Sequence, residues 1–231
     1  MVALQTPTHV AIIVRGTTIW AKRNNAEIKE AYTRRFKRIT DIIELQTQFE
    51  IPVLSFFVLP KINPESHANL MEKIDSLAEF LDQLRGSELI HKNGIKLNIL
   101  GNWYDLPGRI IDSIKQLLNE TQDYDKYFVN FCINYDGQEE ITNACKITAM
   151  KVKSGKLDAD YITKEKIKEE LYTSSFMPPE LMIVTGAKNN LNGFLLWDSA
   201  QATIFFANKL WPEFTTDDFI ESIERWGGNC K

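Results

Sequence analysis

Long apolar runs, a secretory leader and a surplus of positive charge are all missing from this sequence. No stretch approaches the roughly 18 consecutive apolar residues that a membrane-spanning helix needs. Residues 1–9 have no basic region followed by an apolar run, so we expect no secretory signal. The 27 Lys and Arg residues are outnumbered by 31 Asp and Glu residues, which gives a formal net charge of −4. Without a basic stripe, a general nucleic-acid binder is not expected.

Cysteine is scarce as well. The three cysteines, Cys132, Cys145 and Cys230, are odd in number and lack the spacing of a metal site, which favours a reducing, cytoplasmic compartment. Hydrophobic residues make up 44% and charged residues 25%, the balance of an ordinary soluble protein. A chain of 231 residues can bury one sizeable core. No repeat or linker divides it, so we expect a single domain over residues 1–231.

Apolar runs of strand length alternate with segments of helical periodicity along the chain. Ile28, Tyr32, Phe36, Ile39 and Ile43, for example, keep the three-or-four spacing of one buried helix face. This alternation predicts an α/β fold with a mostly parallel central sheet covered on both faces. We expect strands at residues 10–14, 52–59, 95–100, 126–133, 181–185 and 203–206. We expect helices at residues 17–49, with Thr17 or Thr18 as the cap, and at residues 66–84, 106–120, 137–152, 158–172 and 217–226.

Three segments carry a resemblance to a known family. Residues 9–22 read HVAIIVRGTTIWAK, residues 134–141 read NYDGQEEI, and residues 180–214 run from ELMIVTG to LWPEF. In order and spacing they resemble the motifs of the cis-prenyltransferase family: a buried strand with Asp-Gly-Asn and Arg-Trp-Ala-Lys, an Asn-Tyr-Gly-Gly-Arg-x-Glu-Ile turn, and the closing block. The resemblance implies the undecaprenyl-diphosphate-synthase-like fold and an isoprenoid diphosphate or related isoprenoid as ligand. It also implies a homodimer, the usual state in the family.

The sequence departs from the family where active members hold magnesium and diphosphate. By the resemblance, Arg15 replaces the signature Asp, and Lys188 replaces a metal-ligating Glu. Val184, Asn190 and Asn192 replace two arginines and a serine that hold isopentenyl diphosphate. Mg²⁺ needs oxygen ligands, and a cation would instead repel it by about 1 kcal/mol at roughly 4 Å even in water. We therefore expect no cofactor, no Mg²⁺ at this site and no chain elongation by the family's mechanism.

Two interpretations of these exchanges remain open. In the first, the two cations face one another and hold a diphosphate in place of the metal, with backbone N–H groups and hydroxyls at the first helix. In the second, the cations are merely solvated at a pocket that has lost its chemistry. The candidate diphosphate-binding residues are Arg15, Gly16, Thr17, Thr18, Lys22, Arg23 and Lys188.

Acidic residues gather at the NYDGQEE turn. The candidate catalytic residues are Arg15, Asp136 and Glu139, and the two acids, beside Glu140, could serve as acid and base or bind an unexpected metal. The alternative is that Asp136 caps the following helix. We expect His9 to be a structural hydrogen-bonding residue. The leucine-rich stripe over residues 70–84 would be core in most proteins, but the resemblance implies that it lines a tunnel for the isoprenoid tail.

Three functions are compatible with these observations. The first, which the retained scaffold and the charge exchange favour, is an enzyme that acts on an isoprenoid diphosphate by altered prenyl transfer or terpene cyclisation. The second is a catalytically inactive partner subunit of a heteromeric cis-prenyltransferase. Such subunits carry a C-terminal Arg-x-Gly, and Arg225-Trp226-Gly227 has this spelling but falls too soon after residues 210–212, so we expect it not to serve. The third is an isoprenoid-binding protein.

Overall fold

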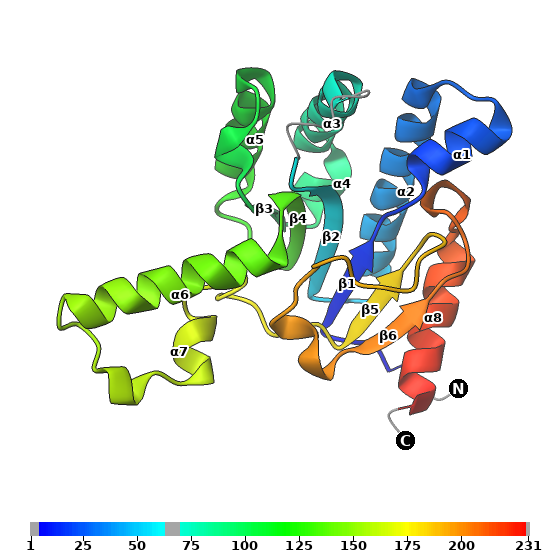
Figure 1. Ribbon diagram of the computed structural model, residues 1–231. Coiled ribbons are helices and arrows are strands. Elements are labelled where there is room, and N and C mark those ends of the chain that lie inside the picture. Colours follow the sequence, from blue (N-terminus) through cyan, green and yellow to red (C-terminus); the bar gives the residue numbers. More distant parts are fainter. Residues whose placement is uncertain (1–4, 63–69, 230–231) are drawn as a thin grey trace.

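The computed structural model describes residues 5–62 and 70–229. These residues form a fold with a central six-stranded sheet. Every strand pairing in the sheet is parallel, as predicted, and the strands lie in the order β3-β4-β2-β1-β5-β6 (Figure 1). The strands are β1 (His9–Ile13), β2 (Val53–Pro60), β3 (Ile95–Leu100), β4 (Tyr127–Tyr135), β5 (Leu181–Val184) and β6 (Thr203–Phe206).

Helices connect the strands, and most of them pack against one face of the sheet. That face carries α2, α3, α5 and α8, whereas α6 and α7 extend away from the body of the molecule (Figure 1). No helix within the described ranges is long and apolar enough to cross a membrane. The α-helices are α1 (Thr17–Asn24), α2 (Ile28–Gln48), α3 (Leu70–Arg85), α4 (Glu88–Lys92), α5 (Gly108–Thr121), α6 (Gly137–Lys153), α7 (Lys164–Lys168) and α8 (Thr216–Asn229). Short 3₁₀ helices span Trp103–Asp105, Ala159–Tyr161, Asp198–Gln201 and Trp211–Glu213.

The two faces of the sheet bury different cores. Successive side chains of a strand point to opposite faces, so Val10 and Ile12 of β1 join the large core beneath the helices. Ala11 and Ile13 instead join a smaller core. That second core is closed by Phe194 and its neighbours in the irregular segment after β5. The sheet is thus covered on both faces, as expected, but unequally.

The first helical region differs from the prediction in two ways. It is divided in two, because Asn25 adopts a left-handed conformation (φ 49°) and its N–H closes α1 by bonding Ala21 O; asparagine tolerates that conformation better than most residues. The cap is also not a threonine. Gly16 precedes α1 with φ 101°, and a Cβ there would lie 2.7 Å from Leu210 Cδ2. Only glycine suits both the angle and the close approach.

A further prediction, a single helix over residues 158–172, is wrong. Asp158 caps a 3₁₀ turn by accepting from Asp160 N, and Thr163 separately caps the five-residue helix α7. Such short polar side chains offer the backbone local partners that compete with a continuous helix. The expected helix start at Ser66 lies outside the described residues, as does Cys230. Cys132 and Cys145 are free thiols, the first of them buried.

Candidate anion-binding site

A cavity of about 380 Å³ lies at the carboxyl ends of three adjacent strands, β2, β1 and β5. The chain leaves β1 toward β2 on one side of the sheet and returns to β5 on the other. Parallel α/β sheets bind ligands in the crevice at such a switch in strand order. The cavity lining includes Arg15, Gly16, Thr17, Thr18, Ile19, Tyr32, Arg35, Val58, Pro60 and Lys188.

The charge of this lining is of one sign. Arg15, Arg35 and Lys188 all line the cavity, and no Asp or Glu of the described chain does. Mg²⁺ takes oxygen ligands and is bound through carboxylates. The described lining residues therefore do not fit a magnesium site, and their positive charge suits an anion. Elsewhere in the described ranges, no group of three His, Cys, Asp or Glu side chains could hold a metal ion.

Arg15 is fixed by the loop that follows β5. Its Nη1 donates to Lys188 O at 3.2 Å and its Nη2 donates to Asn190 Oδ1 at 3.0 Å. Its backbone N–H donates to Thr185 Oγ1 at 3.0 Å, which joins the ends of β1 and β5. Partial burial lowers the pKa of Arg15 below its ordinary value. The structure thus brings Arg15 and Lys188 together as expected, although the direct contact is to the lysine's backbone carbonyl. A guanidinium has five N–H donors, so Arg15 keeps donors for a ligand.

The N-terminus of α1 forms a second wall of the cavity. Among the described residues no side chain caps it, and its first turn carries no acid. The unpaired N–H groups and the helix dipole make such an end favourable for anions. Thr17 is buried, with 4% exposure, and its Oγ1 has no hydrogen-bond partner among the described residues. Thr18 lines the same wall.

Four other candidates lie away from the cavity. Lys22 and Arg23 are exposed on α1 and do not line it. Asp136 caps α6, accepting from Gln138 N at 2.9 Å and Glu139 N at 3.0 Å. Of the two interpretations of Asp136, the helix cap is therefore the one that the structure shows. Glu139 forms an ion pair with Lys61 at 2.8 Å. The cavity therefore gathers Arg15, Gly16, Thr17, Thr18 and Lys188 but not Lys22, Arg23, Asp136 or Glu139.

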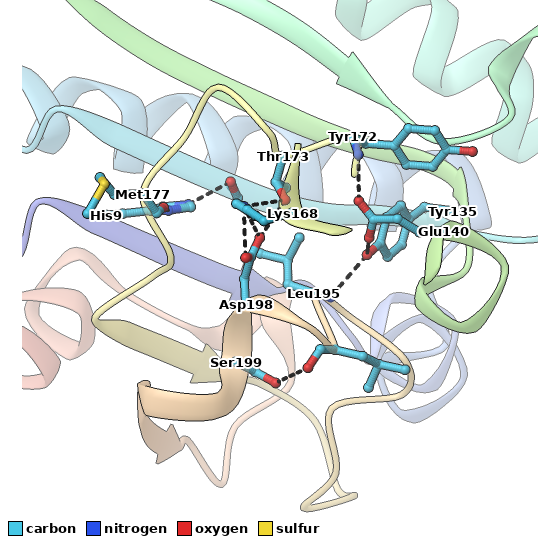
Figure 2. A network of polar contacts seen from close by, with 12 residues as sticks. His9, Tyr135, Glu140, Lys168, Tyr172, Thr173, Met177, Leu195, Asp198 and Ser199 are labelled. Carbon is cyan, nitrogen blue, oxygen red and sulfur yellow. Dashed lines mark hydrogen bonds and ion pairs between the residues drawn. The ribbon is translucent and has the colours of Figure 1, made fainter. Parts of the chain in front are cut away.

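A separate polar network lies on the second face of the sheet (Figure 2). Lys168 donates to both oxygens of Asp198 at 2.8 Å. Glu140 accepts from the Tyr135 hydroxyl and from Tyr172 N, and burial raises the pKa of this carboxyl. The network links α6, the segment around α7 and the loop after β5. These contacts are internal, which indicates a structural role.

His9 lies beside this network and has the structural role expected of it. Its Nδ1 lies 2.7 Å from Met177 O and its Nε2 lies 2.8 Å from Ser55 Oγ (Figure 2). Burial lowers the pKa of His9 to about 4, so the ring is neutral near pH 7. His9 therefore joins the starts of β1 and β2 to the segment before β5.

Comparison with known proteins agrees with the fold. A family model described as putative undecaprenyl diphosphate synthase matches residues 13–231. The chain belongs to this cis-prenyltransferase family. Among its relatives, an isoprenyl transferase of Bacillus subtilis is 30% identical over 220 residues, covering 94% of this chain and 83% of the relative. A tritrans,polycis-undecaprenyl-diphosphate synthase (geranylgeranyl-diphosphate specific) of Thermoplasma acidophilum is 27% identical over 221 residues, covering 94% and 84%.

Solved structures share the fold. Lavandulyl diphosphate synthase from Lavandula x intermedia, in complex with dimethylallyl diphosphate, superimposes with a TM-score of 0.85 at 24% identity, covering 96% of this chain and 95% of that one. A probable undecaprenyl diphosphate synthase from Campylobacter jejuni gives a TM-score of 0.77 at 22% identity, with the same coverage. The undecaprenyl-diphosphate-synthase-like architecture is thereby confirmed.

The leucine-rich stripe of α3 is packed into the core of this family member. Ile74, Leu77, Leu81 and Leu84 are each at most 3% exposed. None of the described residues that line the 380 Å³ cavity comes from α3. Among the described residues, the cavity therefore does not extend along α3, and the tail tunnel that the resemblance implied stays a prediction.

Two cavity residues, Arg35 and Tyr32, were not among the candidates. Arg35 follows Tyr32 by three positions and precedes Ile39 by four, so it falls on the apolar face of α2. A charged residue at helical spacing within an apolar stripe was the signal that could have identified it. The motifs of the resemblance did not include this helix.

Proposed function

We propose that this cis-prenyltransferase family member is an enzyme that acts on an isoprenoid diphosphate by altered prenyl transfer or terpene cyclisation. Arg15, Lys188 and the N-terminus of α1 hold the diphosphate in place of a divalent ion. The observation that carries the proposal is the cavity's lining, which has three cationic side chains and no carboxylate among the described residues.

The chemistry needs a stabilised leaving group above all. Breaking the allylic C–O bond gives its electron pair to the diphosphate and leaves a carbocation. Fixed cations stabilise the charge that develops on the leaving group, and arginine can bind a phosphate group through two parallel hydrogen bonds. A double bond of a second molecule, or of the same chain, then attacks the cation, and a proton is lost. The released diphosphate can accept that proton as the base, since no carboxylate among the described lining residues is present to do so.

One structural neighbour supports the substrate class. That protein is named a lavandulyl diphosphate synthase and was crystallised with dimethylallyl diphosphate, a short allylic diphosphate. The curated relatives are named prenyl transferases and polyprenyl diphosphate synthases. A prenyl diphosphate is therefore the substrate that we propose for this chain.

Activity in the presence of a chelator tests the proposal. We expect product from dimethylallyl, geranyl or farnesyl diphosphate in EDTA, and we expect Arg15→Gln to lower kcat/KM about tenfold or more, the loss typical of a charged hydrogen bond. Lys22→Met, which removes an exposed cation outside the cavity, should behave as wild type. Absence of product under every condition would contradict the proposal, and a bound isoprenoid without turnover would identify a binding protein instead.

A partner-subunit role is the second candidate, and exposed apolar residues favour it. Met150, Tyr161, Ile162 and Met177 are between 42% and 73% exposed in and after the arm formed by α6 and α7. Large apolar side chains exposed on an arm that extends from the molecule are typical of a surface that a partner covers. We propose that this arm contacts a second chain, either another copy or an active relative.

The single-domain organisation and the cytoplasmic location stay predictions.

A further inference from the structure

Arg35 is a buried cation without a carboxylate partner among the described residues. Its side chain on α2 is 7% exposed. The Nη2 group donates to Val58 O at the end of β2, but Nε has no hydrogen-bond partner. No ion pair to Arg35 is formed within the described ranges. Burying a guanidinium without a counter-charge is strongly unfavourable, so a ligand with negative charge is the partner that this position lacks.

The Arg35 side chain lies at the wall of the 380 Å³ cavity, beside Tyr32. Arg35 and Tyr32 both line it, and the guanidinium carbon lies 5.5 Å from the Tyr32 ring centre. Burial raises the pKa of Tyr32, and the nearby charge of Arg35 opposes that rise. Thr17, on the facing wall, also has a buried oxygen without a partner. Two unsatisfied polar groups from different helices thus meet at one cavity.

Beyond Arg35 the interior is filled by aromatic rings. Phe36 stacks on Phe80 with ring centres 4.4 Å apart and planes 12° apart. Phe80 in turn contacts Phe131 edge to face at 5.8 Å. These rings join α2, α3 and β4, and all three are at most 5% exposed. A separate cavity of about 340 Å³ between α2 and α3 is lined in part by Phe36 and Phe80, but it shares no described lining residue with the 380 Å³ cavity, so the two are not continuous there.

We propose that Arg35 determines the specificity of this cavity: its guanidinium binds a phosphate group from the inner wall, and with the Phe36–Phe80 stack it excludes a long isoprenoid tail. The proposal rests on the proposed function and narrows it to short-chain prenyl diphosphates. A volume of about 380 Å³ is at the low end for a small-molecule site, which agrees with a short ligand.

Calorimetric titration in EDTA tests the anion contact. Wild type, Arg35→Met and Arg34→Met are titrated with inorganic diphosphate, dimethylallyl diphosphate and farnesyl diphosphate. We expect Arg35→Met to weaken the binding of all three about tenfold or more, the loss typical of a charged hydrogen bond. Arg34 is the matched control, since it lies on the same helix with its side chain 56% exposed, and its variant should bind as wild type. Unchanged affinity in Arg35→Met overturns the proposal.

Chain length gives an independent readout. Farnesyl diphosphate should bind no more tightly than dimethylallyl diphosphate, because its longer tail finds no further apolar wall. In an open tunnel the extra buried carbons would tighten binding about 100-fold or more, and that result would overturn the exclusion.

The outcomes separate this proposal from the proposed function. Diphosphate binding that depends on Arg35, without turnover of any prenyl diphosphate, would contradict the proposed function alone. Turnover that Arg35→Met leaves unchanged would contradict this inference alone, and a wild type that binds no phosphate compound would contradict both. Arg35→Met should unfold at or above the wild-type temperature, because it removes an uncompensated buried charge. Should it not fold, Arg35→Gln, which also removes the charge but keeps a polar side chain, provides the same comparison.

Discussion

Arg15, Arg35 and Lys188 contribute positive charge to one cavity but are held in different ways. Arg15 already donates to two acceptors of the loop after β5, so part of its hydrogen-bonding capacity keeps that loop in place. Lys188 is exposed and can reorient. Arg35 is buried with an unpaired Nε. We therefore expect Arg15 to orient a bound anion, Lys188 to add charge, and Arg35 to define the anion's inner contact.

His9 makes the stability of the protein depend on pH. In the unfolded chain the imidazole binds a proton near pH 6.5, whereas in the folded protein burial lowers the pKa to about 4. Between these values the unfolded state binds more protons, so the free energy of unfolding decreases as the pH falls through this window, by about 3 kcal/mol in all. The contribution is complete above about pH 6.5.

Denaturation in urea at several pH values between 7 and 4 measures this effect. His9→Gln keeps hydrogen-bonding capacity but does not titrate, so its free energy of unfolding should fall less with pH than that of wild type. The difference between the two proteins isolates His9 from the carboxylates, which titrate in both. Parallel curves for the two proteins would show that His9 does not carry the dependence.

At the scale of elements, the least regular part of the chain forms one wall of the second core. The segment between α6 and β5 contains only α7 and a 3₁₀ turn, and the loop after β5 contains one further 3₁₀ turn. These pieces are joined by Lys168, Thr173 and Asp198 (Figure 2). Hydrogen bonds between side chains thus hold this wall together, whereas the other face is covered by helices with regular backbone hydrogen bonds.

Removing Lys168 should therefore destabilise the fold measurably. The Asp198 side chain is only 3% exposed, and Lys168→Met leaves its carboxylate buried without a counter-charge, at a cost of about 3 kcal/mol. The double variant Lys168→Met with Asp198→Leu should recover part of that loss. Lys92→Met removes an exposed pair with Glu88 and should change stability by under about 1 kcal/mol.

Chemical denaturation of the four proteins gives the comparison. Equal losses in Lys168→Met and Lys92→Met would mean that the network does not organise this region.

At the scale of the whole molecule, two cavities differ in position and in the side chains that line them. The cationic cavity lies at the carboxyl edge of the sheet. A larger cavity of about 710 Å³ lies over β3 and β4 on the second face, lined by Trp103, Tyr104, Phe128, Phe176 and Met177 among others. Aromatic residues and methionine are enriched at protein interfaces. The region of the α6–α7 arm and this aromatic hollow is therefore where we expect association.

Size-exclusion chromatography with light scattering measures that association. We expect a mass twice that of the 26.6 kDa chain, and Tyr161→Glu with Met177→Glu should shift it toward the single-chain value. Met71→Glu is the control, because Met71 is similarly exposed but lies on α3. A wild type that stays monomeric and that does not co-purify with an active relative would contradict the proposed assembly.

Much of the fold could be predicted because its signals are local. Each buried parallel strand is a short apolar run, and the glycines at positions 16 and 101 mark where two of them end. The family motifs likewise lie within single segments, so the order of residues along the chain was enough to identify Arg15 and Gly16. Local signals failed where neighbouring polar groups compete. Asn25 divided the first helical region, and Asp158 and Thr163 divided another.

What only the tertiary structure decided is which side chains share a site. Arg15 and Lys188 are 173 residues apart, and they meet because β1 pairs with β5. Arg35 enters the same cavity because α2 packs its apolar face on the sheet, which carries a charged residue into the interior. Asp136 could have been an acid, a base or a cap from its sequence alone, and the start of α6 decided for the cap. The sequence determines the helices and strands through interactions between neighbouring residues. Contacts between distant segments depend on how these elements pack, and those contacts decide which charged side chains share the site.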